Sequence, residues 1–362
     1  MFEIRFNPIA GEWVIIAAER MKRPVLPADS CPFCPGVGKT PPDYDVLVYQ
    51  NDFPSMTLAA SGDSWVGVDA ADGATQPAGG KAGAHTGVDG QPPTVNAQLP
   101  TGNLYVKRPS FGACEIILYS PDHSANIYEL PDWHIEKLVR CWQQRTRQLG
   151  SIKGIEYVFV FENRGEAVGV TIHHPHGQVY AFPFVPRKIQ REIESCREYL
   201  RKNLHCLVCD MVTEELRQGI RLVKQNEHFI CLVPYFARFP YEAHIISRRH
   251  VGSVVDLSDA EVIAFGEILQ ALVRGYDRLF GFTTAYIMAF HQAPTDGGQY
   301  PAYHFHVEFY PAHADSKTRK HLSGTEIGID VFVNPSDVEA NAARLRRTVE
   351  ASEQQSLAGV SD

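Results

Sequence analysis

The segment from His173 to Gln178 contains the residues whose types and spacing could most clearly perform chemistry. It reads His-His-Pro-His-Gly-Gln. In an extended strand alternate side chains share a face, so we expect His174, His176 and Gln178 to project together. One imidazole can attack phosphorus and another can hold a metal, while the Gln178 amide can donate hydrogen bonds to phosphoryl oxygens. A histidine-rich surface strand is the alternative, and the rest of the chain separates the two interpretations.

Two Cys-x-x-Cys pairs are the second chemical feature, at Cys31/Cys34 and Cys206/Cys209. Tetrahedral zinc takes four nitrogen or sulfur ligands, and such a turn places two thiolates around one ion. The charged start of the chain (Met-Phe-Glu-Ile-Arg) lacks the apolar core of a secretory signal, so we expect a cytoplasmic protein. There the pairs are predicted to bind metal rather than to form disulfides, with turns that carry free thiols as the alternative.

The elements that would position these groups occur twice in the same order. Each half of the chain shows a Cys-x-x-Cys, a His after a strand, a long helix, another strand and a His-x-His. In the first half the helix is expected at about 132–149 and the next strand at 156–162. In the second half the helix is expected at about 258–280, opened by the capping box Ser258-x-x-Glu261. The repeat predicts a duplicated chain whose halves meet through their sheets as a pseudo-twofold pair.

Composition divides the chain further. The stretch at about 58–102 is rich in Gly, Ala, Asp and Pro, and it has no Ile, Phe or Tyr between Ala59 and Thr101. Such a segment cannot bury enough apolar surface to offset its ordering entropy, so we expect a flexible surface insertion, with a functional lid as the alternative. A last helix is expected after the capping box Ser336-x-x-Glu339, and we expect its end to fray.

Size and charge exclude two broad classes of function. With 362 residues, 44% of them hydrophobic and 21% charged, the chain is expected to form a globular protein with two domains or a duplicated one. A net charge of −8 argues against nucleic acid as a partner, because that requires a basic surface. No run of about 18 apolar residues occurs, so no membrane span is expected. An anionic ligand must then be held by a few local cations.

The central motif resembles the histidine-triad superfamily, and His-Pro-His-Gly-Gln is similar to the signature of its galactose-1-phosphate uridylyltransferase branch. Other segments follow that family's order along nearly the whole chain outside the insertion: Asn7-Pro8 with Glu12–Ile15, Arg20 with Arg23-Pro24, Asn51–Phe53, Ser120–His123, Phe161–Gly165, Phe290–Pro294 and Gly324–Glu326. The resemblance implies an α+β fold of two tandem histidine-triad-like halves, each an antiparallel sheet with flanking helices, related by pseudo-twofold duplication. The halves would span 1–186 and 187–350, with a tail at 351–362.

The resemblance also implies an activity. The enzyme would transfer UMP from UDP-glucose to galactose 1-phosphate, giving UDP-galactose and glucose 1-phosphate. His176 would be the nucleophile of a ping-pong route through a uridylyl-histidine, which divides one displacement into two easier ones. Gln178 would stand where hydrolytic relatives carry a third His. The implied assembly is a homodimer.

Positions that match the family's substrate contacts are carried over one by one. They are Asn51, Asp52 and Phe53 for the nucleoside; Asn163, Gly169 and Thr171 for the phosphates; Arg20 and Arg23 for the sugar phosphate; and Lys320, Ser323, Thr325 and Glu326 for the hexose. Two of them depart from the family's pattern. Thr171 stands where Ser is common, and Thr325 stands where Tyr is frequent, which leaves the sugar selectivity open.

The resemblance and the repeat together complete two metal sites. The implied zinc ligands are Cys31, Cys34, His123 and His174 in the first half, and Cys206, Cys209, His250 and His304 in the second. Four protein ligands leave no open position, so we expect two structural zinc ions per chain. Relatives without the second Cys pair place another metal on one Glu and three His. The matching positions here are Glu192, His291, His306 and Glu308, and because Glu308 replaces a His, the intact second Cys pair favours zinc.

Two other functions stay open at this point. An ADP-sugar phosphorylase of the same superfamily would pass its nucleotidyl group to inorganic phosphate, although its relatives more often carry Ser inside the motif. A zinc-stabilised nucleotide-binding protein without turnover would have no need of the intact pair of His176 and Gln178. Labelling with UDP-glucose separates the three hypotheses.

Overall fold

The computed structural model describes residues 2–22, 31–58 and 105–358. Arg23 therefore lies outside the described residues. So do the predicted insertion beyond Leu58, up to residue 102, and the last four residues of the predicted tail.

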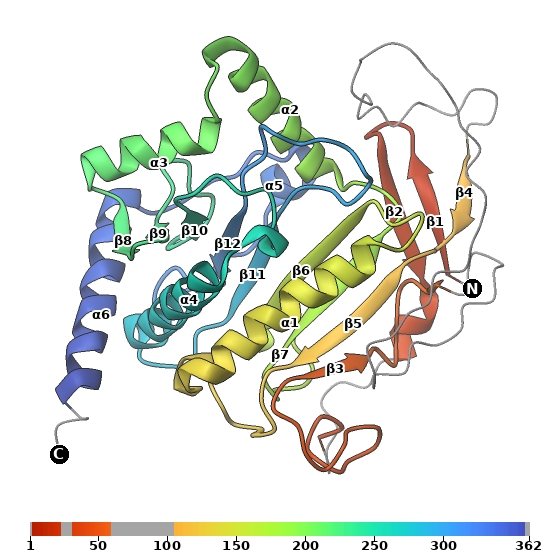
Figure 1. Cartoon of the computed structure of the whole chain (residues 1–362), viewed down its shortest axis with the longest axis horizontal. Helices are drawn as coiled ribbons and strands as arrows, with labels where there is room; N and C mark the ends of the chain where they lie inside the picture. The colour runs from red at the N-terminus through yellow and green to blue at the C-terminus, as the bar shows by residue number, and fades with distance from the viewer. Residues whose placement is uncertain (1, 23–30, 59–104, 359–362) are drawn as a thin grey trace.

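The core of the molecule is one nine-stranded sheet in which every neighbouring pair is antiparallel (Figure 1). Its strands, from one edge to the other, are β3 (Leu47–Gln50), β5 (Ala113–Leu118), β7 (His176–Phe182), β6 (Tyr157–Arg164), β11 (Tyr286–His291), β12 (His306–Pro311), β10 (Ala243–Ser247), β9 (Phe229–Leu232) and β8 (Leu222–Gln225). This arrangement confirms the predicted α+β class with antiparallel sheets.

The strand order is symmetric about the pair β6 and β11 at the centre. Outward from β6 come β7 and β5, and outward from β11 come β12 and β10, which occupy the same places in the second repeat. β6 and β11 pair antiparallel, with Ala289 opposite Phe161 and Tyr286 opposite Arg164. Two sheets that are related by a twofold axis at their junction must pair there through antiparallel strands. The halves thus share one continuous sheet. In each half the last His of the His-x-His is the first residue of a strand, β7 or β12, that lies next to a central strand.

Helices cover both faces of this sheet. They are α1 (Asp132–Gly150), α2 (Arg187–Asn203), α3 (Leu207–Gln218), α4 (Asp259–Phe280), α5 (Gly324–Ile329) and α6 (Val338–Ala358). The long apolar helices α1 and α4 pack on one face, where Val160 and Val179 belong to the main hydrophobic core. On the opposite face, α2 packs through Ile189 and Ile193 and α3 packs through its own apolar cluster. Because side chains alternate between the two faces along β7, His176 and Gln178 project toward the face that α2 covers.

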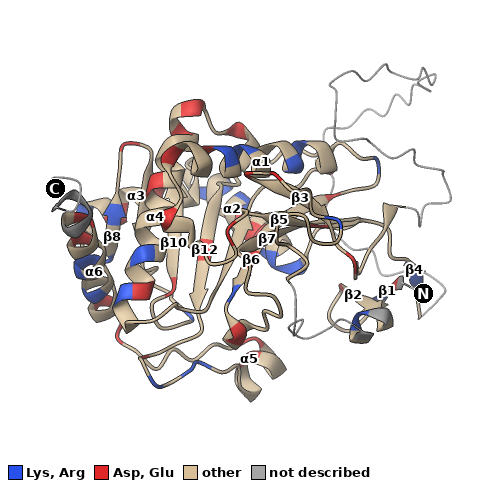
Figure 2. Cartoon of the chain, turned by 90° about the horizontal axis from the view of Figure 1, so that it is seen from below, with Lys and Arg blue, Asp and Glu red and all other residues tan. Residues whose placement is uncertain are grey.

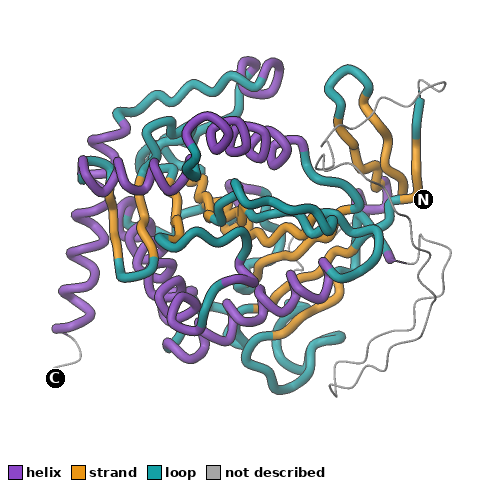
Figure 3. Tube along the Cα trace, turned by 45° about the horizontal axis from the view of Figure 1, so that its top comes forward, coloured by secondary structure: helices purple, strands orange, loops and turns teal. Residues whose placement is uncertain are grey.

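A small second sheet flanks the first. Its order is β2 (Glu12–Ala17), β1 (Phe2–Asn7) and β4 (Lys107–Pro109). Figure 3 shows this hairpin sheet at one end of the molecule and α6 beside β8 at the other. Short 3₁₀ turns complete the described elements: η1 (Ala18–Lys22), η3 (Ile127–Glu129), η4 (Glu166–Val168) and η5 (Val254–Asp256).

The two predicted helix starts had different outcomes. The capping box at α4 is confirmed, because the Ser258 hydroxyl accepts from the Glu261 amide and the Glu261 carboxylate accepts in return. The predicted start at Ser336 is wrong. α6 begins at Val338, and it is Asp337 whose carboxylate accepts from the backbone of Ala340. Asp is as good an N-cap as Ser, and the Ser336 hydroxyl is instead bonded to the side chains of Asn334 and Asn341.

Figure 2 shows basic and acidic residues dispersed over the helices, without a single large basic face. Among the helices that the structure describes, none is both long and apolar enough to cross a membrane.

Candidate active site and metal centres

The imidazole of His176 is held in one tautomer. Its Nδ1 lies 2.8 Å from the carbonyl oxygen of His174, and since a carbonyl can only accept, Nδ1 must carry the proton. In that tautomer the other nitrogen, Nε2, carries no proton, so it is the ring atom able to act as a nucleophile. β7 begins at His176, so His174 precedes the strand instead of lying within it as predicted. Its backbone orients the nucleophile, while its ring turns toward the Cys pair.

Buried side chains surround the nucleophile. His176 and Gln178 are 7% and 8% exposed, and the ring of Phe33 meets His176 edge-on at 5.3 Å. Gln178 lies opposite Ile116 on β5 and Phe161 on β6, in the middle of three paired strands. A low-dielectric surrounding strengthens the hydrogen bonds that these groups can offer to a phosphoryl oxygen.

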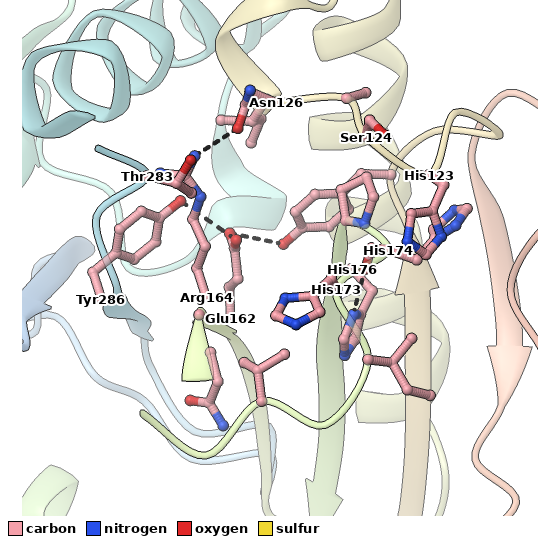
Figure 4. Close-up of a pocket in the computed structure, with 18 residues that line it drawn as sticks. His123, Ser124, Asn126, Glu162, Arg164, His173, His174, His176, Thr283 and Tyr286 are labelled. Carbon is pink, nitrogen blue, oxygen red and sulfur yellow. Dashed lines mark hydrogen bonds between the residues drawn. The ribbon is translucent and has the colours of Figure 1, made fainter. Parts of the chain in front are cut away.

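A cavity of about 260 Å³ opens beside His176, at the junction of the two halves (Figure 4). Its lining includes His176, His173, Glu162, Arg164 and Tyr286. The Arg164 guanidinium is already held by both carboxylate oxygens of Asp277, at 2.7 and 2.8 Å. This Arg is therefore a structural cation of the cavity wall.

The four ligands predicted for the first zinc lie together. Cys31, Cys34, His123 and His174 bring their ligand atoms within 4.8 Å of one another. The Cys34 Sγ is 3.5 Å from Nδ1 of His123 and 3.8 Å from Nδ1 of His174. The Nε2 of His174 donates to the Ser120 carbonyl at 2.7 Å, which leaves Nδ1 bare toward the sulfur atoms. Burial lowers the pKa of His174, which keeps the ring neutral as a metal ligand must be.

The second predicted quartet repeats this arrangement in the other half. Cys206, Cys209, His250 and His304 are also mutually within 4.8 Å. The His304 Nε2 donates to the Ser247 carbonyl at 2.8 Å, and its Nδ1 lies 3.4 Å from the Cys209 Sγ. Burial lowers the pKa of His304 to about 4 and raises that of Cys209 to about 12. At neutral pH such a thiol ionises only when a cation binds it, so both donor sets fit zinc.

The third cluster, Glu192, His291, His306 and Glu308, also forms, but its carboxylates are already paired. His291 bridges them, with Nδ1 2.9 Å from Glu192 and Nε2 3.0 Å from Glu308. Lys188 lies 2.6 Å from Glu308, and Arg238 lies 3.2 Å from it. These cations neutralise the site without a metal, which weakens its fit to a further ion.

His306 repeats the geometry of His176. Its Nδ1 lies 3.0 Å from the His304 carbonyl, as that of His176 lies 2.8 Å from the His174 carbonyl. The residue two positions later differs, because Glu308 stands where the first half has Gln178. A carboxylate there would repel a phosphoryl group. Only the first half therefore combines an oriented imidazole with an uncharged amide.

The residues predicted to bind the nucleoside reach the same region. Asn51 opens a turn in which its side chain accepts from the Phe53 amide at 2.9 Å. Asp52 accepts from the Tyr49 hydroxyl at 2.7 Å, and the Tyr49 ring meets Phe33 edge-on. Because Phe33 also touches His176, the turn is connected to the nucleophile through one layer of rings.

The residues predicted to contact the phosphates come from η1, from β6 and from the loop that precedes β7. Arg20 donates to the Tyr180 hydroxyl at 3.2 Å, and Tyr180 is on the same strand and face as Gln178. Asn163, near the end of β6, lines the cavity. Gly169 adopts a left-handed conformation (φ 83°) that ends the turn η4. The Thr171 hydroxyl is buried without a hydrogen-bond partner among the described residues, so it has a free donor.

The four residues predicted to contact the hexose form a separate cluster. Glu326 accepts from Lys320 at 2.6 Å and from the Ser323 amide at 2.9 Å, and its contacts also include Thr325. Hydrogen bonds from Lys320 and Ser323 hold the pKa of Glu326 far below its usual range. Among the described residues that line the cavity at His176, none belongs to this cluster.

Sequence reasoning missed several residues that shape the site. Tyr44 donates to the carbonyls of Phe33 and Ser120 at 2.8 and 3.0 Å, which ties the Cys turn to the His174 acceptor. The Tyr119 hydroxyl lies against Gly177 of β7, and it donates a hydrogen bond to Glu162. Phe33 could have been suspected from its place between the two Cys. The others are recognised only by contacts between distant segments.

Comparison with solved structures identifies the class of protein. A structure described as a uridylyltransferase superposes with a TM-score of 0.78 at 28% identity, covering 97% of this chain and 99% of that one. An ADP-glucose phosphorylase from Arabidopsis thaliana superposes with a TM-score of 0.67 at 21% identity, covering 96% and 99%, which shows a shared fold only. The fold and the His-x-His-x-Gln site together are those of a nucleotidyltransferase.

Sequence comparison identifies the family. Residues 87–186 match the model of the galactose-1-phosphate uridyl transferase N-terminal domain, and residues 192–355 match that of the C-terminal domain. The galactose-1-phosphate uridylyltransferase of Thermotoga maritima is 36% identical over 350 residues, 96% of this chain and 99% of the relative. That of Haemophilus influenzae is 30% identical, covering 94% and 92%. The chain therefore belongs to the galactose-1-phosphate uridylyltransferase family, whose members are uridylyl-transferring enzymes.

Proposed function

We propose that the enzyme transfers UMP from UDP-glucose to galactose 1-phosphate through a uridylyl group carried on His176. The observation that carries the proposal is the hydrogen bond from His176 Nδ1 to the His174 carbonyl, because it fixes the tautomer in which Nε2 carries no proton. Galactose 1-phosphate and UDP-glucose are the sugar phosphate and nucleotide sugar that the family name and the sequence resemblance suggest.

In the first step Nε2 of His176 attacks the α-phosphorus of UDP-glucose. A nitrogen–phosphorus bond forms while the bond from that phosphorus to the bridging oxygen breaks, and its electron pair leaves with glucose 1-phosphate. The leaving group is stable as an anion, so no acid proton is needed at the position of Gln178. The protein contributes mainly orientation and charge stabilisation, as in other phosphoryl transfers.

In the second step a phosphate oxygen of galactose 1-phosphate attacks the same phosphorus. The nitrogen–phosphorus bond breaks, its electron pair returns to Nε2, and UDP-galactose is released. We assign Gln178, Asn163 and the unpartnered Thr171 hydroxyl to the phosphoryl oxygens, with Arg20 as the nearby cation. Arg binds phosphate through two parallel hydrogen bonds.

We assign the two metal positions to zinc held by the Cys-containing quartets. Zinc closed by four protein ligands supplies no chemistry to the substrate, and it stabilises the fold around it. In the first half the ligand His174 also provides the carbonyl that orients His176. The need for reduced thiols favours a cytoplasmic location.

We propose that two chains assemble to complete the hexose site. None of the described residues that line the cavity at His176 belongs to the predicted hexose cluster, and the segment around that cluster exposes apolar side chains that a solvated surface would not require. They are Leu322, Ile327, Ile329, Val331 and Val333. Burial of this apolar segment against a second copy would remove these side chains from water and could bring Lys320 and Glu326 to the partner's nucleophile.

The test is incubation of the purified enzyme with UDP-glucose that is labelled in its uridine. We expect acid-labile label on the protein, which galactose 1-phosphate then releases as UDP-galactose. Release by inorganic phosphate alone would identify a phosphorylase. A protein that binds the nucleotide but takes up no covalent label would be a binding protein, and the proposed mechanism would be wrong.

A further inference from the structure

The backbone of the nucleophile strand rests directly on a buried hydroxyl group. Gly177 lies between His176 and Gln178, and a Cβ built on it would lie only 2.2 Å from the Tyr119 hydroxyl oxygen. Tyr119 is 1% exposed, and its amide donates to the Pro175 carbonyl at 3.0 Å. The hydroxyl thus supports the strand from the α1 and α4 face, opposite the face from which His176 projects.

This hydroxyl is in turn held by Glu162. One carboxylate oxygen of Glu162 accepts from Tyr119 at 3.3 Å, and the other accepts from Tyr286 at 3.4 Å. Tyr119 follows β5 in the first half, whereas Tyr286 starts β11 in the second half. Figure 4 shows Glu162 between Tyr286 and the nucleophile region, at the wall of the cavity. A single carboxyl therefore connects the second half to the support of the nucleophile strand.

The second half shows that the fold itself does not need this polar arrangement. β11 and β12 pair as β6 and β7 do, with Ala289 opposite Glu308 where the first half has Phe161 opposite Gln178. By that register the counterparts of Glu162 and Gly177 are Phe290 and Val307, both fully buried and apolar. A buried carboxyl in place of an apolar residue costs stability. That cost is carried only in the half that has the oriented imidazole and the amide.

We propose that Glu162 is a positioning residue for uridylyl transfer, acting through the Tyr119 hydroxyl on the strand that carries His176. The inference rests on the proposed nucleophilic role of His176. Contact with the Tyr119 hydroxyl sets the position of the Gly177 backbone, and the hydrogen bond to Glu162 holds that hydroxyl in place. Loss of either would let the imidazole and the Gln178 amide shift relative to the bound phosphate, which lowers the rate of transfer more than the binding of substrate.

The charged groups around Glu162 pair with each other and leave its carboxyl to hold the Tyr119 hydroxyl. Burial raises the pKa of this carboxyl to about 7, and the nearby Arg164 and the hydrogen bonds from Tyr119 and Tyr286 oppose that effect. Asp277, the other charged group facing it, is occupied by Arg164 at 2.7 Å. The two tyrosine hydroxyls are therefore the groups that solvate the carboxyl inside the protein.

The experiment is a single-turnover measurement of protein labelling by UDP-glucose, at varied UDP-glucose concentration, in three variants. Tyr119→Phe and Glu162→Gln each remove one link of the support. Tyr157→Phe is the matched control, because Tyr157 is equally buried on β6 and donates at 3.4 Å to a backbone carbonyl, that of Phe290. We expect Tyr119→Phe and Glu162→Gln to lower the maximal labelling rate about tenfold with an unchanged half-saturating concentration, and Tyr157→Phe to retain the parent rate.

The double variant adds a second readout. If the two residues act in sequence, Tyr119→Phe combined with Glu162→Gln will be no slower than the slower single variant. Parent-like labelling rates in both single variants, or an equal loss in Tyr157→Phe, would overturn the inference. Thermal melting and zinc content show whether each variant is folded. If one of the two single variants does not fold, the labelling rate of the other decides the test. An unlabelled parent enzyme would instead refute the proposed function.

Discussion

The His174 backbone carbonyl accepts the Nδ1 proton of His176 at 2.8 Å, while the His174 ring presents Nδ1 to the first Cys pair. One residue thus joins the metal position to the orientation of the nucleophile. The Nε2 of the same His174 ring donates to the Ser120 carbonyl oxygen at 2.7 Å. A disturbance of the first metal site is therefore transmitted to His176 through a single residue of backbone.

His176→Asn should lower uridylyl transfer by about 10⁴-fold or more and leave the fold intact, because a covalent nucleophile has no substitute among nearby groups. Steady-state turnover and covalent labelling are the measurements. His228→Asn, in the turn between β8 and β9, is the control and should retain activity. A folded His176→Asn enzyme with near-normal turnover would refute the proposed mechanism.

Each Cys quartet should hold one zinc ion, so elemental analysis should find about two per chain. Cys34→Ser should remove one ion and also slow the labelling of His176, because His174 is shared. Cys206→Ser should remove the other ion with a smaller effect on labelling. One zinc in the parent that Cys206→Ser leaves unchanged would limit the assignment to the first site. A third metal would place an ion on Glu192 and Glu308.

Gly177→Ala should destabilise the enzyme by about 1–3 kcal/mol, because the new methyl group would overlap the Tyr119 hydroxyl and force the backbone to shift. Urea unfolding measures the loss. Adding Tyr119→Phe should recover part of the stability by removing the closest atom. Gly324→Ala, where a Cβ meets no atom within 4 Å, is the control. Equal stability of Gly177→Ala and the parent would contradict the close packing.

The stability of Glu162→Gln relative to the parent should depend on pH. Burial raises the pKa of Glu162 from 4.5 to about 7, so the folded parent binds an extra proton between those values and its stability falls as the pH rises through them. Above pH 7 the penalty is complete, of the order of 3 kcal/mol. Glutamine carries no such penalty. The difference in unfolding free energy should therefore move in favour of the variant from pH 4.5 to 7, and a constant difference would show that Glu162 is not buried as described.

Charge placed in the exposed apolar segment should separate the proposed dimer. Ile327 and Ile329 are 75% and 71% exposed in one chain, and burying them against a second copy would exclude an unpaired carboxylate. Ile327→Asp should shift the mass in solution from dimer to monomer and reduce turnover with galactose 1-phosphate more than labelling by UDP-glucose. Ile263→Asp on α4 is the control. A parent that is monomeric and fully active would remove the need for a second copy.

The sequence by itself predicted the two Cys-containing quartets, whose ligand atoms lie together in the structure, and it predicted His176 as the nucleophile. The family resemblance implied His123 and His174 as partners of the first Cys pair, and the order of elements kept twice pointed to His250 and His304 for the second. Alternation along a strand predicted the shared face of His176 and Gln178. These inferences hold because ligand chemistry and strand periodicity depend on residue type and local spacing. The sequence also predicted the helices α1 and α4, whose apolar periodicity is strong.

Only the tertiary structure decided which strands join the halves and what supports the strand that carries His176. The pairing of β6 with β11 places Tyr286 beside Glu162, and no local pattern encodes that contact. The same holds for the Tyr119 hydroxyl under Gly177 and for Lys188 at Glu308. Such features depend on residues distant in sequence, whose meeting is fixed by packing rather than by spacing.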